Sequence, residues 1–192
     1  MKAISICVLL LLFPLSHAIA QEDVKTRSLF NFTLPGAAGQ WRSVNDDVMG
    51  GISSSRLEAA EEGYVQFSGV VSLENNGGFA SVRCLPRSFD LDNCDGIRLR
   101  IRGDGKDYRL RLHTSDGFDG VAYQSIFATE ADRWISVDIP FSSFTASFRG
   151  REVPNAPALD PARIRQIGFM IADGQEGSFR LDITSISAIC TK

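Results

Sequence analysis

The sequence predicts an all-β fold, a jelly-roll β-sandwich, and three observations lead to that prediction. Short runs alternate apolar and polar residues, as strands with one buried face do. Clusters of glycine and aspartate separate these runs at short intervals. Helical periodicity is almost absent from the chain. Many short strands joined by regular turns are typical of β-sandwiches.

The candidate strands follow one another along most of the chain. They are Tyr64–Ser72, Gly78–Leu85, Ile97–Arg102, Tyr108–His113, Val121–Phe127, Trp134–Ile139, Gln166–Ala172 and Ser178–Ile189. The run Gln166–Ala172 is apolar nearly throughout, which predicts a central strand covered on both faces. Pro140–Phe144 and Pro161–Arg163 are each expected to hold a helical turn.

The clearest pattern joins Ile97–Arg102 to Tyr108–His113 through the turn Gly103–Asp107, which predicts a hairpin. Because side chains alternate along a strand, one face of this hairpin is apolar and the other is basic. The basic set is Arg98, Arg100, Arg102, Arg109 and Arg111 with His113. It is either a binding face for an acidic partner, a phosphate or a polar glycan, or a solvated face salt-bridged to Asp138 and Asp182.

Residues 1–20 have the pattern of a secretory signal peptide. Lys2 precedes the apolar run Ile4–Leu15, and Ala18-Ile19-Ala20 resembles a cleavage site before Gln21. A membrane anchor is the alternative, but the run is shorter than the roughly 20 residues that a span needs. We therefore expect an exported protein, periplasmic or extracellular, with no transmembrane segment after cleavage. Residues 21–27 are then a short N-terminal extension, and residues 28–192 form one β-sandwich domain.

Composition limits the chemistry that the chain can perform. Its 192 residues are 44% hydrophobic and carry a net charge of −3, which argues against disorder and against nucleic-acid binding through bulk positive charge. Cleavage would leave one histidine, His113, so a zinc site with several histidines is excluded. It would also leave Cys84, Cys94 and Cys190. In an oxidising compartment these predict one disulfide and one spare thiol, with Cys84–Cys94 preferred as the nearest pair.

Two acidic segments are candidate chemical sites. Asp46 and Asp47 are adjacent, so their side chains point in different directions and make a poor acid/base pair. The Gly50-Gly51 pair that follows could cradle an anion, but it lacks the lysine of a phosphate-binding loop, and the motif alone is most simply a turn. The segment Asp90–Asp95 lacks EF-hand spacing and leaves open only a looser calcium site. No cofactor or metal is predicted.

Several blocks together resemble the complex I intermediate-associated protein 30 family. The blocks are Val44–Ser53, Gly77–Arg83, Arg102–Gly105 with Tyr108, Arg149–Arg151, and Ile167–Asp173 followed by Gly177, Phe179 and Leu181. They occur in order over roughly residues 30–190. The resemblance implies a jelly roll of the galactose-binding-like type. It also implies a non-catalytic role, because the best-known members are assembly chaperones for respiratory complex I.

The sequence therefore predicts a non-enzymatic binding or assembly-factor module in an exported form. Its partner would be a protein, such as a respiratory-chain or other membrane complex. The alternative is a secreted carbohydrate-binding module, since relatives of the fold include such modules and Trp134 falls on a polar face. Asp46, Asp47, Asp138 and His113 form no recognised catalytic arrangement, so no enzymatic activity is predicted.

Two regions are the candidate binding sites. The first is the loop with Asp46, Met49, Gly50 and Gly51, together with Arg83. The second is the outward face that bears Arg100, Arg111, Trp134 and Asp138.

Overall fold

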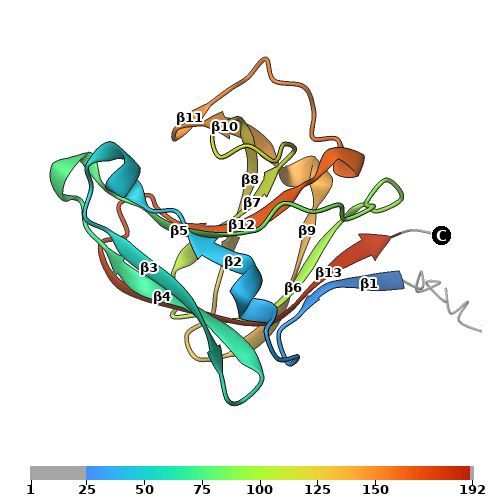
Figure 1. Ribbon diagram of the computed structural model, residues 1–192, viewed down its shortest axis with the longest axis horizontal. Helices are drawn as coiled ribbons and strands as arrows, with labels where there is room; N and C mark the ends of the chain where they lie inside the picture. The colour runs from blue at the N-terminus through green and yellow to red at the C-terminus, as the bar shows by residue number, and fades with distance from the viewer. Residues whose placement is uncertain (1–24, 191–192) are drawn as a thin grey trace, which may run out of the picture.

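Two β-sheets pack face to face around one core in the computed structural model, which describes residues 25–190 (Figure 1). The predicted β-sandwich is confirmed. The predicted signal peptide, residues 1–20, lies outside the described residues, as do residues 21–24. The first strand begins at Lys25, inside the stretch assigned above to an extension. Within residues 25–190 no helix is both long and apolar enough to cross a membrane.

Sheet A has the strand order β3-β4-β13-β6-β9, and β1 also pairs with β13. Its strands are β1 (Lys25–Asn31), β3 (Ser54–Ala60), β4 (Tyr64–Val71), β6 (Gly96–Arg102), β9 (Trp134–Pro140) and β13 (Gly177–Cys190). The last strand, β13, holds this sheet together. Its first half pairs with β4, its second half pairs with β1, and its other edge pairs with β6.

Sheet B has the strand order β11-β10-β8-β7-β12-β5-β2. Its strands are β2 (Trp41–Ser43), β5 (Ala80–Cys84), β7 (Asp107–His113), β8 (Ala122–Ala128), β10 (Thr145–Phe148), β11 (Arg151–Glu152) and β12 (Gln166–Ile171). Every residue of β12 is buried, as its apolar sequence predicted. The strand β12 lies between β5 and β7, its inward side chains enter the core, and Gln166 on the other face donates to the carbonyl of Ser115.

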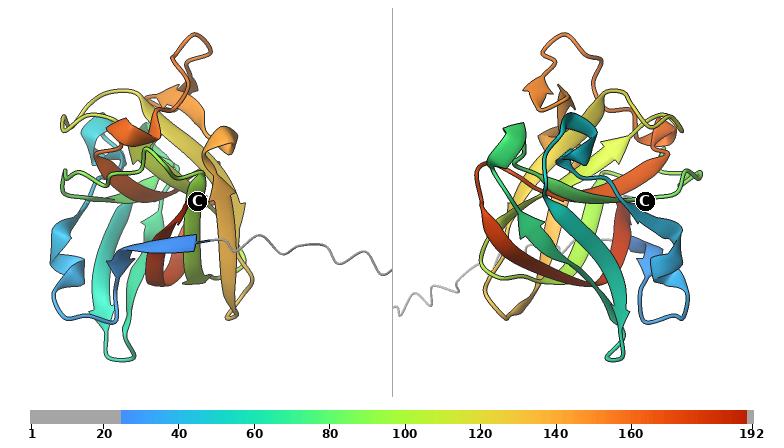
Figure 2. Two further views of the ribbon diagram at one scale, coloured as in Figure 1. Left: turned by 90° about the vertical axis from the view of Figure 1, so that its right-hand side faces the viewer. Right: turned by 60° about the vertical axis from the view of Figure 1, so that its left-hand side comes forward.

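Short 3-10 turns connect the strands. They are η1 (Ala37–Gln40), η2 (Asp46–Met49), η3 (Glu74–Asn76), η4 (Phe141–Ser143) and η5 (Pro161–Arg163). Two of them, η4 and η5, are the helical turns expected from the sequence. The connection after β11 projects from one end of the sandwich, as both views of Figure 2 show.

The core lies between the sheets and is built from the inward side chains of both. The rings of Phe67 and Phe179 of sheet A have centroids 4.8 Å apart, and each lies 6.4 Å from the ring of Tyr108 of sheet B. The alternating apolar residues of β6 and β7 are all buried, as predicted. Burial of these side chains is the main force that holds the two layers together.

The predicted hairpin of Ile97–Arg102 and Tyr108–His113 is wrong, because β6 belongs to sheet A and β7 to sheet B. The turn between them carries the chain from one layer to the other. Both strands point their apolar residues into the same core from opposite sides. Alternation alone cannot distinguish this arch from a hairpin. As a consequence the basic residues of the two strands lie on opposite outer surfaces of the protein.

The disulfide also differs from the expected pair. Cys94 is bonded to Cys190 at the end of β13, and Cys84 is a free, buried thiol. Cys84 lies inside β5, where its Sγ accepts a hydrogen bond from the amide of Ile167, 3.2 Å away. Burial raises the pKa of the Cys84 thiol. Nearness in sequence was the wrong guide, since Cys94 lies beside the C-terminal end of the central strand.

Candidate functional site

Asp46 anchors the first predicted region from inside the protein. Its side chain is fully buried. One carboxylate oxygen accepts the amide of Ser53 at 2.9 Å. The other accepts the Ser53 hydroxyl at 2.5 Å and the amides of Gly78 and Phe79 at 2.7 and 3.2 Å. Burial opposes ionisation, but these hydrogen bonds outweigh it and lower the pKa of Asp46.

The two glycines after Met49 are explained by this anchor. Gly50 has φ of 91°, in the left-handed region that favours glycine. At Gly51 an added Cβ would lie only 2.4 Å from Cγ of Asp46. Asp46, Gly50 and Gly51 therefore shape the loop, and no ligand has access to the Asp46 carboxylate in this conformation.

The anchored loop presents apolar side chains to solvent. Met49, Ile52 and Leu73 are 51%, 57% and 46% exposed. The amide of Ser72 donates to the Ser53 hydroxyl at 3.0 Å, which brings the segments of Ile52 and Leu73 together. We call Met49, Ile52 and Leu73 the apolar loop patch. Exposed apolar groups on a rigid base are typical of protein contact surfaces.

On the outer face of sheet A most charges are paired with a neighbour. Arg98 binds both carboxylate oxygens of Asp138 at 2.6 Å, and these bonds lower the pKa of Asp138. Arg102 binds the buried Asp182 at 2.8 Å and lies 4.9 Å from the ring centroid of Trp134. Salt bridges of this kind were the second interpretation of the basic residues, and it holds for Arg98 and Arg102.

On the outer face of sheet B, by contrast, arginines line up without acids. Register places Arg42 of β2 opposite Arg83 of β5, and Gly168 of β12 between Arg83 and Arg111 of β7. Gln124 of β8 continues the line beyond Arg111. Residues directly opposite each other point to the same face, so these side chains form one transverse line. We call Arg42, Arg83 and Arg111 the arginine row.

The acids near the arginine row are already bound to other arginines. The pairs are Arg109–Asp173, Arg149–Asp119 and Arg165–Asp116. Within residues 25–190 none of the three arginines of the row has a carboxylate in ion-pair contact. Burial, together with the charges of Arg83 and Arg109, lowers the pKa of Arg111 to about 10. The Nε of Arg111 is buried and has no hydrogen-bond partner among the described residues.

The β7–β8 connection covers one side of the row. Arg83 donates to the carbonyl of Phe118 at 3.1 Å, and the Phe118 ring centroid lies 5.3 Å from the guanidinium carbon. Gln166 donates to the carbonyl of Ser115 at 2.7 Å. Beneath this cover, burial lowers the pKa of His113 to about 3, helped by the nearby arginines, so this histidine is neutral at physiological pH.

The structure thus regroups the residues of the predicted sites. Arg83 lies beside Arg111 rather than in the Asp46 loop. Arg111 lies on the opposite sheet from Arg100, Trp134 and Asp138. Sequence reasoning missed Arg42, Gly168 and Phe118, because their proximity depends on pairing between strands far apart in the chain. The available signal was an arginine at an outward position within each of the strands β2, β5 and β7.

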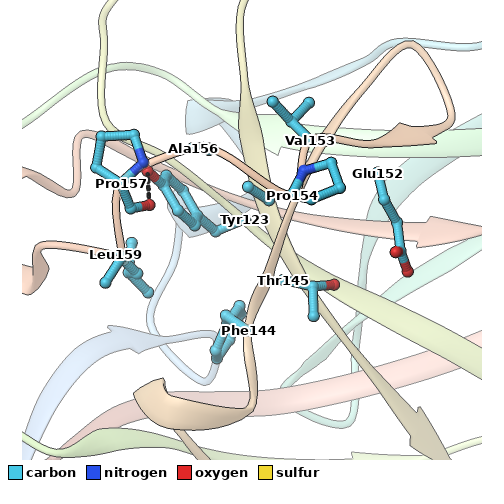
Figure 3. Close-up of a pocket in the computed structure, with 11 residues that line it drawn as sticks. Tyr123, Phe144, Thr145, Glu152, Val153, Pro154, Ala156, Pro157 and Leu159 are labelled. Atoms are coloured by element: carbon cyan, nitrogen blue, oxygen red, sulfur yellow. Dashed lines mark hydrogen bonds between the residues drawn. The ribbon is translucent and has the colours of Figure 1, made fainter.

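A hollow lies elsewhere, under the connection that follows β11. It has a volume of about 240 Å³, and Figure 3 shows Tyr123, Phe144, Pro154 and Leu159 around it. The Tyr123 hydroxyl donates to the Pro157 carbonyl at 3.0 Å and ties the connection to β8. None of the predicted site residues lines this hollow. The described residues also hold no group of three or more potential metal ligands.

Comparison with known proteins identifies relatives of this chain. The Complex I intermediate-associated protein 30 family matches residues 30–183. A relative in Drosophila melanogaster, named mitochondrial complex I intermediate-associated protein 30, is 28% identical over 83% of this chain and 61% of its own length. Its mouse counterpart is 27% identical over 90% of this chain and 58% of its own length. An uncharacterised protein of Schizosaccharomyces pombe is 32% identical over 78% of this chain and 77% of its own.

Solved structures support the fold. A family 11 carbohydrate-binding module of a Clostridium thermocellum cellulase superposes with a TM-score of 0.67 at 20% identity, over 88% of this chain and 96% of the module. An agarase superposes with a TM-score of 0.58 at 10% identity, over 87% of this chain and 25% of the enzyme. At such identities the likeness concerns architecture alone.

The names of the relatives also correct one expectation. The fly and mouse proteins are both described as mitochondrial, which points to a mitochondrial rather than an exported location. The prediction of export to the periplasm or the extracellular space is therefore wrong. The match over residues 30–183 covers most of the sequence and the predicted blocks, and the chain belongs to the complex I intermediate-associated protein 30 family.

Proposed function

We propose that the chain is a non-enzymatic assembly module of the mitochondrion that binds a protein component of a complex I assembly intermediate. The family match, with fly and mouse relatives named for complex I intermediates, is the observation that carries this proposal. The chain spans about 60% of those two relatives, so the proposal concerns the shared module. The buried, neutral His113 supports the absence of catalysis, because it offers no accessible base.

The apolar loop patch is the proposed contact with the partner. Met49, Ile52 and Leu73 are exposed and belong to segments that the buried Asp46 and Ser53 hold in place. A preformed apolar surface loses little conformational freedom on binding, which favours association. The partner surface is expected to be apolar as well, and therefore a protein rather than a polar glycan.

The test is whether the full-length chain captures complex I subunits from cells. Tagged protein is expressed in Drosophila cells depleted of their own family member, and complex I subunits are quantified in the captured material. We expect the unaltered chain to capture complex I subunits. Ile52→Asp and Leu73→Asp should reduce their recovery about tenfold or more, because a charge enters a desolvated contact.

Leu34→Asp is the matched control, since Leu34 is 60% exposed and lies outside the patch. It should capture as much as the unaltered chain. Equal recovery by Ile52→Asp would remove the patch from the proposal. Failure of the unaltered chain to capture any complex I subunit would overturn the assembly function itself.

A carbohydrate-binding function is the second candidate, favoured by Trp134 on an outer sheet face beside Arg102. An aromatic ring among hydrogen-bonding side chains can stack on a sugar. The ring of Trp134 also packs against Tyr64, with centroids 5.7 Å apart, so part of its surface is already used. Binding on a glycan array that disappears in Trp134→Ala would favour this candidate over the assembly module.

A further inference from the structure

The arginine row has the features of an anion site, and this inference does not depend on the assembly function. Arg83 and Arg111 stand on either side of Gly168, one strand away in each direction. Two strand spacings separate their backbones by about 10 Å. Arginine side chains are long enough to converge over the midpoint. Gly168 has no side chain to fill the space between them.

The electrostatics of Arg111 point to a missing acceptor. Its Nε is buried without a hydrogen-bond partner among residues 25–190. Buried guanidinium groups in folded proteins are normally paired with acids or carbonyl oxygens. The nearby acids do not serve, because Asp173, Asp119 and Asp116 are each held by a different arginine. The lowered pKa of Arg111 reflects the same uncompensated burial.

The carboxylate of Asp119 acts on Arg83 from a distance, but Arg149 already binds it. On β2, Arg42 extends the row, and on β8, Gln124 is neutral. His113 is held neutral, and the cover contributes the carbonyl and ring of Phe118 to Arg83. Neighbouring guanidinium groups repel one another unless an anion lies between them. Exposed Arg100 on the other sheet is different, since solvent reaches it and Ser136 is its neighbour.

We propose that the outer face of sheet B binds a phosphate group between Arg83 and Arg111, above Gly168. Each guanidinium can donate a parallel pair of hydrogen bonds to two oxygens of an anion. A phosphate offers three or four oxygens to two such forks, whereas both forks would have to share the two oxygens of a carboxylate. The phosphate is either free or the terminal group of a small phosphate ester, and both present the same oxygens.

The test measures binding of two probes to the full-length chain by calorimetry in 150 mM potassium chloride. The probes are inorganic phosphate and adenosine monophosphate. We expect at least one of them to bind, and Arg111→Met to weaken that binding tenfold or more. The matched control is Arg100→Met, which removes the same charge from the opposite sheet and should change the dissociation constant less than twofold.

Thermal unfolding separates loss of the site from loss of the fold. Without phosphate, Arg111→Met should melt no lower than the unaltered chain, because it removes a half-buried charge whose Nε lacks a hydrogen-bond partner among the described residues. With phosphate, only the unaltered chain and Arg100→Met should gain melting temperature. Should Arg111→Met fail to fold, Arg111→Lys keeps the charge but loses the fork, and should weaken binding threefold or more.

The two probes distinguish a free anion from a phosphate ester. Binding of phosphate supports a free anion, and binding of adenosine monophosphate alone supports a phosphate ester. Binding of neither probe would overturn the proposal. Equal weakening by Arg111→Met and Arg100→Met would also overturn it, because the effect would then be one of overall charge.

Discussion

At the scale of single residues, replacement of Asp46 is expected to cause a large loss of stability. Asp46→Asn replaces a carboxylate that accepts four hydrogen bonds with an amide whose nitrogen cannot accept. We expect a loss of about 2–3 kcal/mol in the free energy of unfolding at pH 7, measured by urea denaturation. Asp47→Asn is the control, because Asp47 is exposed and its replacement should change the free energy of unfolding by less than about 0.5 kcal/mol. Equal effects at the two positions would contradict the anchor.

The same residue predicts a dependence on pH. Because folding lowers the pKa of Asp46 below its ordinary 3.8, its contribution is present above that value and lost as pH falls through the folded pKa. The stability gap between the unaltered chain and Asp46→Asn should therefore narrow below pH 4. Urea titrations at pH 7 and at pH 3 check this. A gap that stays constant would show that the ionised form is not the one stabilised.

Gly51 is expected to tolerate no side chain. An added Cβ would lie 2.4 Å from Cγ of Asp46, and Asp46 cannot move without breaking its hydrogen bonds. Gly51→Ala should lower the free energy of unfolding by about 1–3 kcal/mol, as overpacking does. Gly39→Ala is the control, because nothing lies within 4 Å of its added Cβ. A Gly51→Ala variant as stable as Gly39→Ala would mean that the loop adjusts freely.

At the scale of elements, the disulfide between Cys94 and Cys190 closes a sequence separation of 96 residues. A loop of that length is expected to add at most about 4–5 kcal/mol by restricting the unfolded chain. Reductant should therefore lower the urea midpoint of the unaltered chain and leave Cys94→Ala unaffected. Cys84→Ala should remain sensitive to reductant. If reductant had no effect on the urea midpoint of Cys84→Ala, a disulfide between Cys84 and Cys94 would be supported instead.

The strands also show how far sequence patterns reach. Alternation predicted the inward residues of β6 and β7 correctly, because burial on one face is a local property. It assigned them to one hairpin wrongly, because which sheet a strand joins depends on distant partners. The strand β3 was missed, since its Ser-Ser-Arg-Leu-Glu-Ala-Ala sequence has few of the residues typical of strands. The strands β10 and β11 were missed because they are short.

The same distinction explains the candidate sites. The Asp46 loop could be found in the sequence because its motif, from Asp46 to Ser53, is contiguous. Its structural role could not, because the donors Gly78 and Phe79 come from another segment. The arginine row could not be predicted from the sequence for a similar reason. Arg42, Arg83 and Arg111 meet only through the register of β2, β5, β12 and β7.

At the scale of the whole molecule, sheet A depends on its last strand. Removing residues 177–192 takes away the partner of β1, β4 and β6 at once. We expect the shortened chain to lack cooperative unfolding by circular dichroism and to be degraded rapidly by protease. Removing residues 1–31 takes away β1, which pairs only with β13, and should lower stability without abolishing the transition. A cooperative transition in the chain that lacks residues 177–192 would contradict this view.

The position of β13 has a consequence for timing. A domain whose central strand is synthesised last cannot complete its fold while the chain is still being made. At ribosomal rates of about 5–20 residues per second, 192 residues take roughly 10–40 s. Throughout that interval the nascent chain remains without its finished core. The apolar strands made earlier therefore lack their central partner until residues 177–190 have been synthesised.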